Sequence, residues 1–280
     1  MTVRHAKSIA VRILLYGVLL LFVLICIFPF YMMVSGSTKN NSELITLNQK
    51  LLPQQVNFRK YALLSERFPF WRISLNTVFF AGSKAILAVL FCSMAGFALA
   101  KYPFPGRSIC FALVLITLMV PFQSIIVPSY LILARFRWLN TFWGLIVPGA
   151  VPAFGTFMMR QFFVASFPDE VLDAARIDGC TEFSLYWKIV IPLSAPSMWV
   201  LGMIILMLNW KNFIWPFVVV SKEEMFTIPI VIQAIAAGGV HEDWGQALAA
   251  STVGTIPLIV LFLVAQKYFI SGLMSGFSKG

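Results

Sequence analysis

Three observations predict an all-α integral membrane protein with six membrane-spanning helices. Hydrophobic residues make up 60% of the 280 residues, above the roughly 45–50% that is typical of soluble domains. Charged residues make up only 11%. The apolar residues also gather into runs of about 20, the length that crosses a bilayer as a helix. These runs lie at residues 13–34, 74–100, 108–133, 141–163, 197–220 and 248–270.

The first run is expected to be a retained membrane span. Arg4, Lys7 and Arg12 precede it, as basic residues precede the apolar core of a secretory signal. A signal core is only about 7–15 residues long and ends at small residues, whereas this run is longer and Pro-Phe-Tyr follows at residues 29–31. We therefore expect residues 1–73 to form a cytoplasmic segment, a first span and an external connection.

The orientation of the chain depends on the basic residues around that first span. Under a six-span topology, the Lys and Arg residues divide almost evenly between the two sides. Cytoplasmic loops usually carry the excess of these residues, and the first span usually dominates. We therefore expect both termini in the cytoplasm, a transmembrane core at residues 74–270 and a C-terminal tail at residues 271–280.

The fourth and fifth runs are interrupted by prolines and polar residues, such as Pro148 and Pro152 in the fourth and Lys211 in the fifth. Interrupted spans are tolerated where neighbouring helices or a cavity satisfy the freed backbone groups, so both runs are candidates for a transport path. Lys84, well inside the second run, either lines the bundle interior, which we favour, or extends along its helix to the bilayer surface. The candidate path residues are Lys84, Gln123, Asn209, Trp210, Lys211 and Asn212.

The sequence lacks the residues of common enzymatic and metal sites. Its two histidines exclude a zinc or di-iron site that draws on several imidazoles, and its four scattered cysteines form no metal or disulfide pattern. No phosphate-binding G-x-x-x-x-G-K-[ST] loop occurs. Ion coupling would require acidic residues inside a membrane span. None of the 11 acidic residues falls inside a predicted span. We therefore expect a partner protein to supply the energy for transport; the rival interpretation is a stand-alone channel or an ion-coupled carrier.

Residues 168–193, PDEVLDAARIDGCTEFSLYWKIVIPL, form a polar segment between two apolar runs. This segment holds five of the 11 acidic residues of the chain. Pro168 fits the first turn of a helix, and Asp169 and Glu170 follow it where the helix dipole favours negative charge. The composition predicts a helix that begins at Pro168 and faces a partner.

The remainder of the polar segment predicts an elbow and a second helix. Gly179 fits a left-handed stop for the first helix. The second helix is expected from about Glu182 until Pro192 ends it. The result would be a helix, a glycine elbow, a helix and a proline.

Helical spacing gives the first helix of the polar segment two different sides. Asp169, Asp173 and Arg176 are expected to form one charged stripe. A small apolar side suits insertion into a groove of a partner, but it equally suits packing against the spans of the same chain. The residues of this apolar side are Val171, Ala174 and Ala175.

The order of residues in the polar segment resembles the EAA motif, E-A-A-x3-G-x9-I-x-L-P, of ABC importer permease subunits. The match runs from Asp173-Ala174-Ala175 through Gly179 to Ile189-Val190-Ile191-Pro192, with Asp in place of Glu and Ile191 in place of Leu. In that family the segment is the cytoplasmic coupling helix, seated in a cleft of the ATPase subunit. The resemblance implies a type I ABC importer permease fold with a cytoplasmic coupling loop at residues 164–197. The implied ATPase-coupling residues are Glu170, Asp173, Ala174, Ala175, Arg176, Asp178, Gly179 and Pro192.

Other stretches resemble the carbohydrate-uptake branch of that family, best known from the maltose importer, and within it the second, shorter permease. The resemblance covers nearly the whole chain, and AARIDG at residues 174–179 and the ending QKYFISGLMSGFSKG are its most specific parts. The other matching stretches are LNT at 75–77, KYPFPGR at 101–107, MVP at 119–121, LNT at 139–141 and FMMRQFF at 157–163.

The resemblance implies the partners and the location of the protein. Members of this branch work in the bacterial cytoplasmic (inner) membrane as a heterodimer of two permeases with two ATPase subunits and an external solute-binding protein. ATP and Mg are bound by the ATPase, so this chain is expected to be a non-catalytic transport subunit without a cofactor of its own. The implied cargo is a carbohydrate, and the alternatives are a polyol, a sugar phosphate, an amino acid or a polyamine.

In this branch the connection between the last two spans contacts the binding protein, which here places the contact at about residues 221–247. Its paired glycines fit either a mobile loop or an ordinary turn. The candidate binding-protein contacts are Gly238, Gly239, His241 and Trp244.

The fifth run departs from the pattern of the branch at one position. The family usually has W-N-x-F-x-W-P, whereas residues 210–216 read WKNFIWP. Lys211 either favours an anionic solute or pairs with a carbonyl of the partner permease, and we favour the pairing. Trp210, Phe213 and Trp215 fit either sugar stacking or a membrane-interface belt, and we favour the belt for Trp215.

Overall fold

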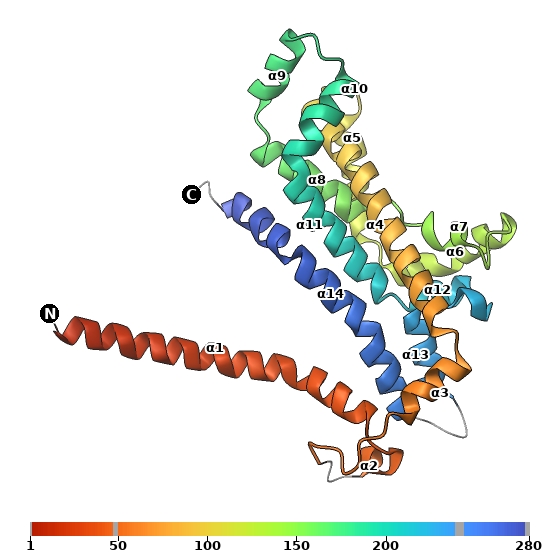
Figure 1. Ribbon diagram of the computed structural model, residues 1–280. Coiled ribbons are helices and arrows are strands. Elements are labelled where there is room, and N and C mark those ends of the chain that lie inside the picture. The colour runs from red at the N-terminus through yellow and green to blue at the C-terminus, as the bar shows by residue number, and fades with distance from the viewer. Residues whose placement is uncertain (1, 47–49, 239–243, 278–280) are drawn as a thin grey trace. The chain divides into compact units, whose positions relative to one another are not determined.

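The computed structural model describes residues 2–46, 50–238 and 244–277, and all regular structure in these ranges is helical (Figure 1). The chain divides into two compact units, Met1–Phe70 with Val231–Ile256, and Trp71–Ile230 with Pro257–Gly280. The helices up to the start of the second unit are α1 (Thr2–Ser37), α2 (Asn41–Ile45), α3 (Arg59–Arg67) and α4 (Phe70–Lys101). Next come α5 (Arg107–Met119), α6 (Phe122–Arg135), α7 (Phe142–Ile146), α8 (Ala153–Ser166), α9 (Asp169–Ile177) and α10 (Glu182–Leu185). A π-helical segment, η1 (Tyr186–Val190), leads into α11 (Ile191–Trp210), α12 (Ile214–Val219), the 3-10 turn η2 (Glu223–Met225), α13 (Ile228–Ala236) and α14 (Trp244–Phe277).

Among the described residues, four helical stretches are long and apolar enough to cross a membrane, and one bent pair adds a fifth candidate. The predicted first, second and sixth runs correspond to single helices. The six-span count is not reproduced, because the third run is the bent pair and the fourth is split. The qualifying stretches are Val11–Ser37, Phe70–Lys101, Glu182–Trp210 and Trp244–Leu263.

Pro121 explains the break in the third run, and a glycine with a left-handed backbone lies in the break of the fourth. In the third run, α5 and α6 meet at a bend of 102°, and Val120 is extended because the ring of Pro121 disfavours a helical residue before it. In the fourth run, Gly149 has a positive φ of 73° between α7 and α8. With 14 residues, α8 extends only about 21 Å, which is shorter than the roughly 30 Å hydrocarbon layer.

The fifth run begins earlier and ends earlier than the sequence predicts. Pro192 does not end the second helix of the polar segment, which continues to Trp210 as one 29-residue stretch. Pro192 lies in the first turn of α11, where its missing N–H is tolerated. The wider turns of η1 precede it, and the Ile191 N–H donates to the Tyr186 carbonyl five residues back. The expectation of a helix stop at Pro192 was therefore wrong.

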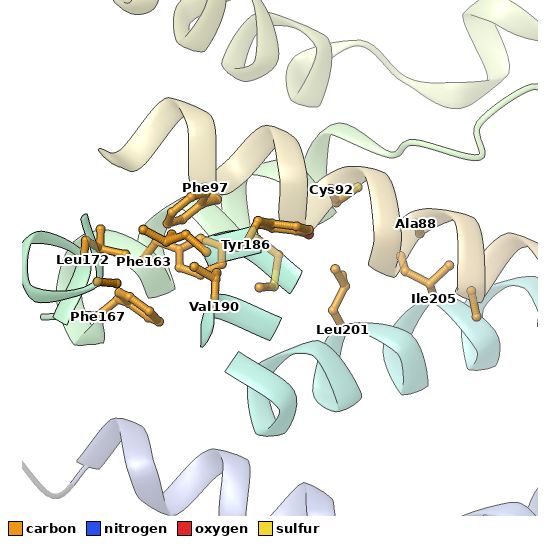
Figure 2. Packing of buried hydrophobic residues seen from close by; sticks show 14 residues of the cluster. Ala88, Cys92, Phe97, Phe163, Phe167, Leu172, Tyr186, Val190, Leu201 and Ile205 are labelled. Carbon is orange, nitrogen blue, oxygen red and sulfur yellow. The ribbon is translucent and has the colours of Figure 1, made fainter. Parts of the chain in front are cut away.

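In the second unit, a stripe of small residues lets α4 approach α8 and α11 closely. Ala85, Ala88, Cys92 and Gly96 are buried in α4. Ala88 and Cys92 belong to the same apolar cluster as Leu201 and Ile205 of α11 (Figure 2). A Cβ atom on Gly96 would lie 2.7 Å from Cβ of Met159 in α8. Small residues are typical of close helix contacts in membranes.

A second apolar cluster joins the first half of α4 to α7 and α12. It contains Phe80, Leu145, Trp215 and Val219. The indole N–H of Trp215 donates to the Leu145 carbonyl at 3.1 Å, which satisfies one of the orphan carbonyls at the end of α7. Trp215 is thus a buried packing residue, and its assignment to a membrane-interface belt was wrong.

Within the first unit, buried lysines hold the connection after α1. Lys60 Nζ donates to the Lys39 carbonyl at 2.5 Å and to Asn41 Oδ1 at 3.1 Å. Lys39 Nζ donates in turn to the Lys50 carbonyl at 2.5 Å. Each buried ammonium is therefore hydrogen-bonded, as burial of a charge requires.

Candidate functional site

The polar segment begins with α9, at one end of the second unit (Figure 1). Pro168 is the extended N-cap, and Asp169 and Glu170 occupy the first turn, which confirms the predicted helix start. Asp169 also forms a tertiary contact: its Oδ1 lies 2.6 Å from Nζ of Lys101, the last residue of α4. The same Nζ donates to the Phe167 carbonyl at 2.7 Å. The N-terminal end of α9 is therefore attached to the end of α4.

Gly179 ends α9 with a left-handed turn, as predicted. Its φ is +79°, and the Cys180 N–H donates to the Ala175 carbonyl while the Gly179 N–H donates to that of Arg176, both at 3.0 Å. This pair of bonds is a Schellman motif. A Cβ on Gly179 would meet no atom within 4 Å, so the backbone angle alone explains the need for glycine.

Just beyond the elbow, Thr181 caps α10 by accepting a hydrogen bond from the Ser184 N–H at 3.3 Å. Glu182, the first residue of α10, binds two side chains through its two carboxylate oxygens. Arg176 Nε donates to Oε1 at 2.9 Å, and the hydroxyl of Tyr102 donates to Oε2. Burial, assisted by the Glu182 hydrogen bond, raises the pKa of Tyr102 to about 12, so its phenol keeps the proton that it donates.

The three charged residues that the helical spacing places on one side of α9 are all exposed, but they have different partners. Arg176 Nη1 lies 3.2 Å from Asp173 Oδ1, whereas Asp169 pairs with Lys101. The reason is that the end of α4 lies beside the first turn of α9 and offers Asp169 a closer cation. The predicted stripe therefore contains one pair within α9 and one tertiary pair with α4.

The apolar side of α9 also differs from the prediction. Leu172 and Ala175 are buried, with Ala175 only 6% exposed, and Figure 2 shows Leu172 beside Phe163 and Phe167. Ala174 is exposed instead. In this conformation Ala175 faces the chain's own core and not a partner, because positions 172 and 175 lie one turn apart on the inward side.

The outward side of α9 and the elbow presents charged and apolar residues together. Asp173 and Asp178 are exposed, and Ile177 is 87% exposed although it is strongly apolar. Phe183 in α10 is 74% exposed. Exposed apolar side chains rimmed by polar ones mark interaction sites. The exposed predicted coupling residues are Glu170, Asp173, Ala174, Arg176, Asp178, Gly179 and Pro192.

The six candidate path residues do not gather at one place. Lys84 is buried in α4, and its Nζ lies 5.2 Å from the centre of the Phe80 ring. This places Lys84 within the helix packing, as expected of a residue in the bundle interior. Gln123 is exposed in the first turn of α6. Their role in a transport path stays a prediction.

The other four path residues lie at the end of α11 and just beyond it. Asn209 Nδ2 donates to the Ile205 carbonyl at 2.8 Å, and Asn212 Oδ1 accepts from the Trp215 N–H at 3.2 Å. Trp210 is buried, whereas Lys211 is exposed at the C-cap. Among the described residues, no three His, Cys, Asp or Glu side chains are grouped so as to hold a metal ion.

The candidate binding-protein contacts are described in part. Gly238 and Trp244 are exposed. Gly239 and His241 lie outside the described residues. Their contact with another protein stays a prediction.

Two Leu-Asn-Thr triplets, noted in the sequence only for their family resemblance, hold the segment that follows α12. Asn76 Nδ2 donates to the carbonyls of Glu224 and Phe226 at 2.8 and 3.1 Å. Thr77 accepts the Ile228 N–H at 3.0 Å. Asn140, with a φ of +57°, accepts the N–H groups of Ser221 and Lys222 through its Oδ1.

Polar side chains therefore form tertiary contacts near both ends of α4, at Asn76 and at Lys101. Asn76 and Lys101 are separated by about 37 Å along an ideal helix, which exceeds the roughly 30 Å of the hydrocarbon layer. Nothing in the spacing of the triplets identifies their distant partners, because residues about 150 positions apart meet only in the folded chain.

Residues 88–274 match the family described as "Binding-protein-dependent transport system inner membrane component". The chain is 33% identical to the arabinooligosaccharides transport system permease protein AraQ of Bacillus subtilis (strain 168), over 99% of each chain. It is 34% identical to AraQ of Halalkalibacterium halodurans over 91% of this chain and 92% of that one. It is 30% identical to the sn-glycerol-3-phosphate transport system permease protein UgpE of Escherichia coli O1:K1 / APEC, over 92% and 94% of the two chains.

The fold also matches a solved structure of a bacterial ABC transporter involved in the import of the acidic polysaccharide alginate. The TM-score is 0.80 at 24% identity, and the match covers 94% of this chain and 98% of the other. At this identity the likeness describes the fold, and it agrees with the type I ABC importer permease architecture expected from the sequence.

Proposed function

We propose, from the premise that this chain belongs to the family of binding-protein-dependent transport system inner membrane components, that its polar segment couples it to an ATPase and that its cargo is a carbohydrate. Family membership makes the chain a multi-pass, inner-membrane permease subunit without catalytic activity, which works with an ATPase and a solute-binding protein. The observation that carries the proposal is the outward side of α9 and its elbow, where Asp173, Ala174 and Ile177 are exposed. An exposed helix of this kind suits insertion into a groove of a partner.

In the proposed mechanism, the chain alternates between inward-open and outward-open states. ATP, with Mg, binds to the partner ATPase and closes its dimer, which displaces α9 and tilts the spans. A ligand shifts such an equilibrium only through its tighter binding to one state. The polar segment must therefore transmit the preference of ATP for the closed dimer.

The proposed assembly contains this chain, a second homologous permease, two ATPase subunits and an external solute-binding protein. Both termini and the polar segment would face the cytoplasm. The segment held by Asn76 and Asn140 lies at the opposite end of α4 from Lys101 and would face outward. The candidate contacts for the binding protein at Gly238 and Trp244 would also lie on the outer side of the membrane.

The proposed cargo follows from the relatives. Two of them are described as arabinooligosaccharide transport permeases, which supports a carbohydrate. A sugar or polyol phosphate is the second candidate, because another relative is described as an sn-glycerol-3-phosphate transport permease. Selectivity would depend largely on the binding protein and the second permease.

The test begins with purification of the chain from native membranes, where a stoichiometric ATPase is expected. ATP-dependent uptake is then measured in proteoliposomes that contain the complex and its binding protein. Asp173→Arg reverses the charge of an exposed coupling residue and should abolish uptake while the binding protein keeps its affinity for the solute. Purification without any ATPase, or undiminished uptake by the variant, would contradict the proposal. A thermal-shift ligand screen of the binding protein would identify the cargo.

A further inference from the structure

We infer that Lys101 and Tyr102, two consecutive residues at the end of α4, are positioning residues that hold α9 at both of its ends and transmit its displacement to α4. This inference rests on the proposed function, because it assigns a route to the movement that an ATPase would impose on the polar segment. Neither Lys101 nor Tyr102 lies in α9, so neither is part of the outward side that would contact the ATPase.

Lys101 holds the beginning of α9. Its side chain is 7% exposed, and its Nζ contacts both Asp169 Oδ1 at 2.6 Å and the Phe167 carbonyl at 2.7 Å. The two acceptors lie on either side of Pro168, at the junction of α8 and α9. A lysine ammonium has three donors and no acceptor, so this single group fixes both the residue before the N-cap and the first turn of α9 with respect to the end of α4.

Tyr102 holds the other end of α9 through Glu182. Its hydroxyl donates to one carboxylate oxygen of Glu182, and the other oxygen accepts from Arg176 in the last turn of α9. The elbow at Gly179 lies between Arg176 and Glu182. Tyr102 therefore fixes the two sides of the elbow through one carboxylate.

The pair is itself anchored in the packed part of α4. The ring of Tyr102 meets that of Phe97 edge to face, with centroids 5.5 Å apart. Phe97 also packs on Phe163 of α8 and on Tyr186 of η1 (Figure 2). Tyr186 Oη lies 2.7 Å from Ser93 Oγ. A displacement of α9 that reaches Tyr102 thus reaches α4, α8 and η1 together.

The contacts that would transmit a displacement of α9 differ from those that would dock the ATPase. Packed interiors behave as rigid bodies because their side chains interdigitate at crystal-like density. By contrast, α9 enters that interior mainly through Leu172 and Ala175, which resist separation but permit sliding, because apolar contacts are non-directional. The hydrogen bonds of Lys101 and Tyr102 are directional, so they resist the sliding and rotation that apolar contacts allow.

The test uses the full transporter in proteoliposomes and the variants Lys101→Met, Tyr102→Phe and their double variant. Lys101→Met keeps the aliphatic stem and removes the ammonium, and Tyr102→Phe keeps the ring and removes the hydroxyl. The matched control is Lys101→Arg, which keeps a charged donor. Measured quantities are the ATPase subunits per permease, the rate of ATP hydrolysis and the solute imported per ATP hydrolysed.

The double variant is expected to bind the ATPase in the normal ratio and to hydrolyse ATP, while the solute imported per ATP falls about tenfold, a typical size for coupling between sites. Lys101→Arg should retain coupling, because it keeps the charged donor that Lys101→Met removes. A normal ratio of ATPase subunits in the double variant would show that its loss of coupling is not a loss of folding. Normal import per ATP in the double variant would overturn the inference. Loss of the ATPase subunits from that variant would overturn it too, since the pair would then support docking. If the unmodified transporter contained no ATPase, the proposed function itself would fail before any variant was compared.

Discussion

Replacement of Gly96 by alanine tests whether α4 and α8 are in as close contact as the structure shows. A Cβ at this position would lie 2.7 Å from Met159 Cβ and 2.8 Å from the Arg160 amide nitrogen. Because ordinary Cβ contacts begin near 3.4 Å, the helices would have to separate by about 0.7 Å, an overpacking strain that costs about 1–3 kcal/mol. Alanine is intrinsically better than glycine in a helix by about 0.5–1 kcal/mol. The net result should be a destabilisation of up to about 2.5 kcal/mol.

The assay is a denaturant titration of the purified protein in detergent micelles, and Gly82→Ala is the matched control. Gly82 lies in the same helix, and a Cβ there would meet no atom of this chain within 4 Å. The control should therefore gain about 0.5–1 kcal/mol from helix propensity. If Gly96→Ala proved as stable as Gly82→Ala, the reasoning about the close contact of α4 and α8 would be refuted.

Three further substitutions have definite expected outcomes. Gly179→Ala should cost about 1–2 kcal/mol, because a φ of +79° strains a residue with a Cβ, and limited proteolysis should then cut the elbow faster; an unchanged cleavage rate would contradict this. Trp215→Phe leaves the Leu145 carbonyl without its 3.1 Å indole donor and should cost about 1–3 kcal/mol of stability, measured by thermal unfolding. The control is Trp143→Phe at an exposed position. Equal effects of the two substitutions would be evidence against the buried hydrogen bond. Asn76→Leu removes two hydrogen bonds to backbone carbonyls and should by itself cost about 1–3 kcal/mol of stability. An unfolding temperature equal to that of the native protein would count against a stabilising role of these two bonds.

The sequence was sufficient for the fold class because membrane spans depend on local composition. The runs at 13–34, 74–100 and 248–270 correspond to helices of suitable length. The bend between α5 and α6 and the split of the fourth run depend on how neighbouring segments satisfy the backbone. Hydropathy does not report that, although Pro148 and Pro152 indicated an interruption of the fourth run. The break at Pro121 in the third run was not predicted.

Local backbone chemistry in the polar segment was equally readable. Pro168, the acidic first turn and Gly179 are where the structure has a helix start and a helix stop. Pro192 misled because a proline also fits a first helical turn, and the preceding π-helical turns bring the chain to that position without a break. Which of these two roles a proline takes is decided by residues packed around it.

Tertiary contacts were beyond the sequence. Lys101 was noted in the sequence only as the start of a stretch with family resemblance, and its contact with Asp169 joins residues 68 positions apart. Trp215 looked like an interface residue because its type is common there, but α7 supplies a buried acceptor for its indole N–H. The buried side of α9 also depends on where α8 lies, so spacing alone left two orientations for the alanines.

The central claim is that the outward side of α9 contacts an ATPase, and site-directed cross-linking tests it most directly. In a transporter whose four cysteines are first replaced by serine, a single cysteine is introduced at Ala174, Ala175 or Ile177, and a short thiol cross-linker is added. Cysteines at the exposed positions 174 and 177 should cross-link to the copurifying ATPase, whereas one at buried position 175 should not. Equal cross-linking at all three positions, or none at 174 and 177, would contradict the account.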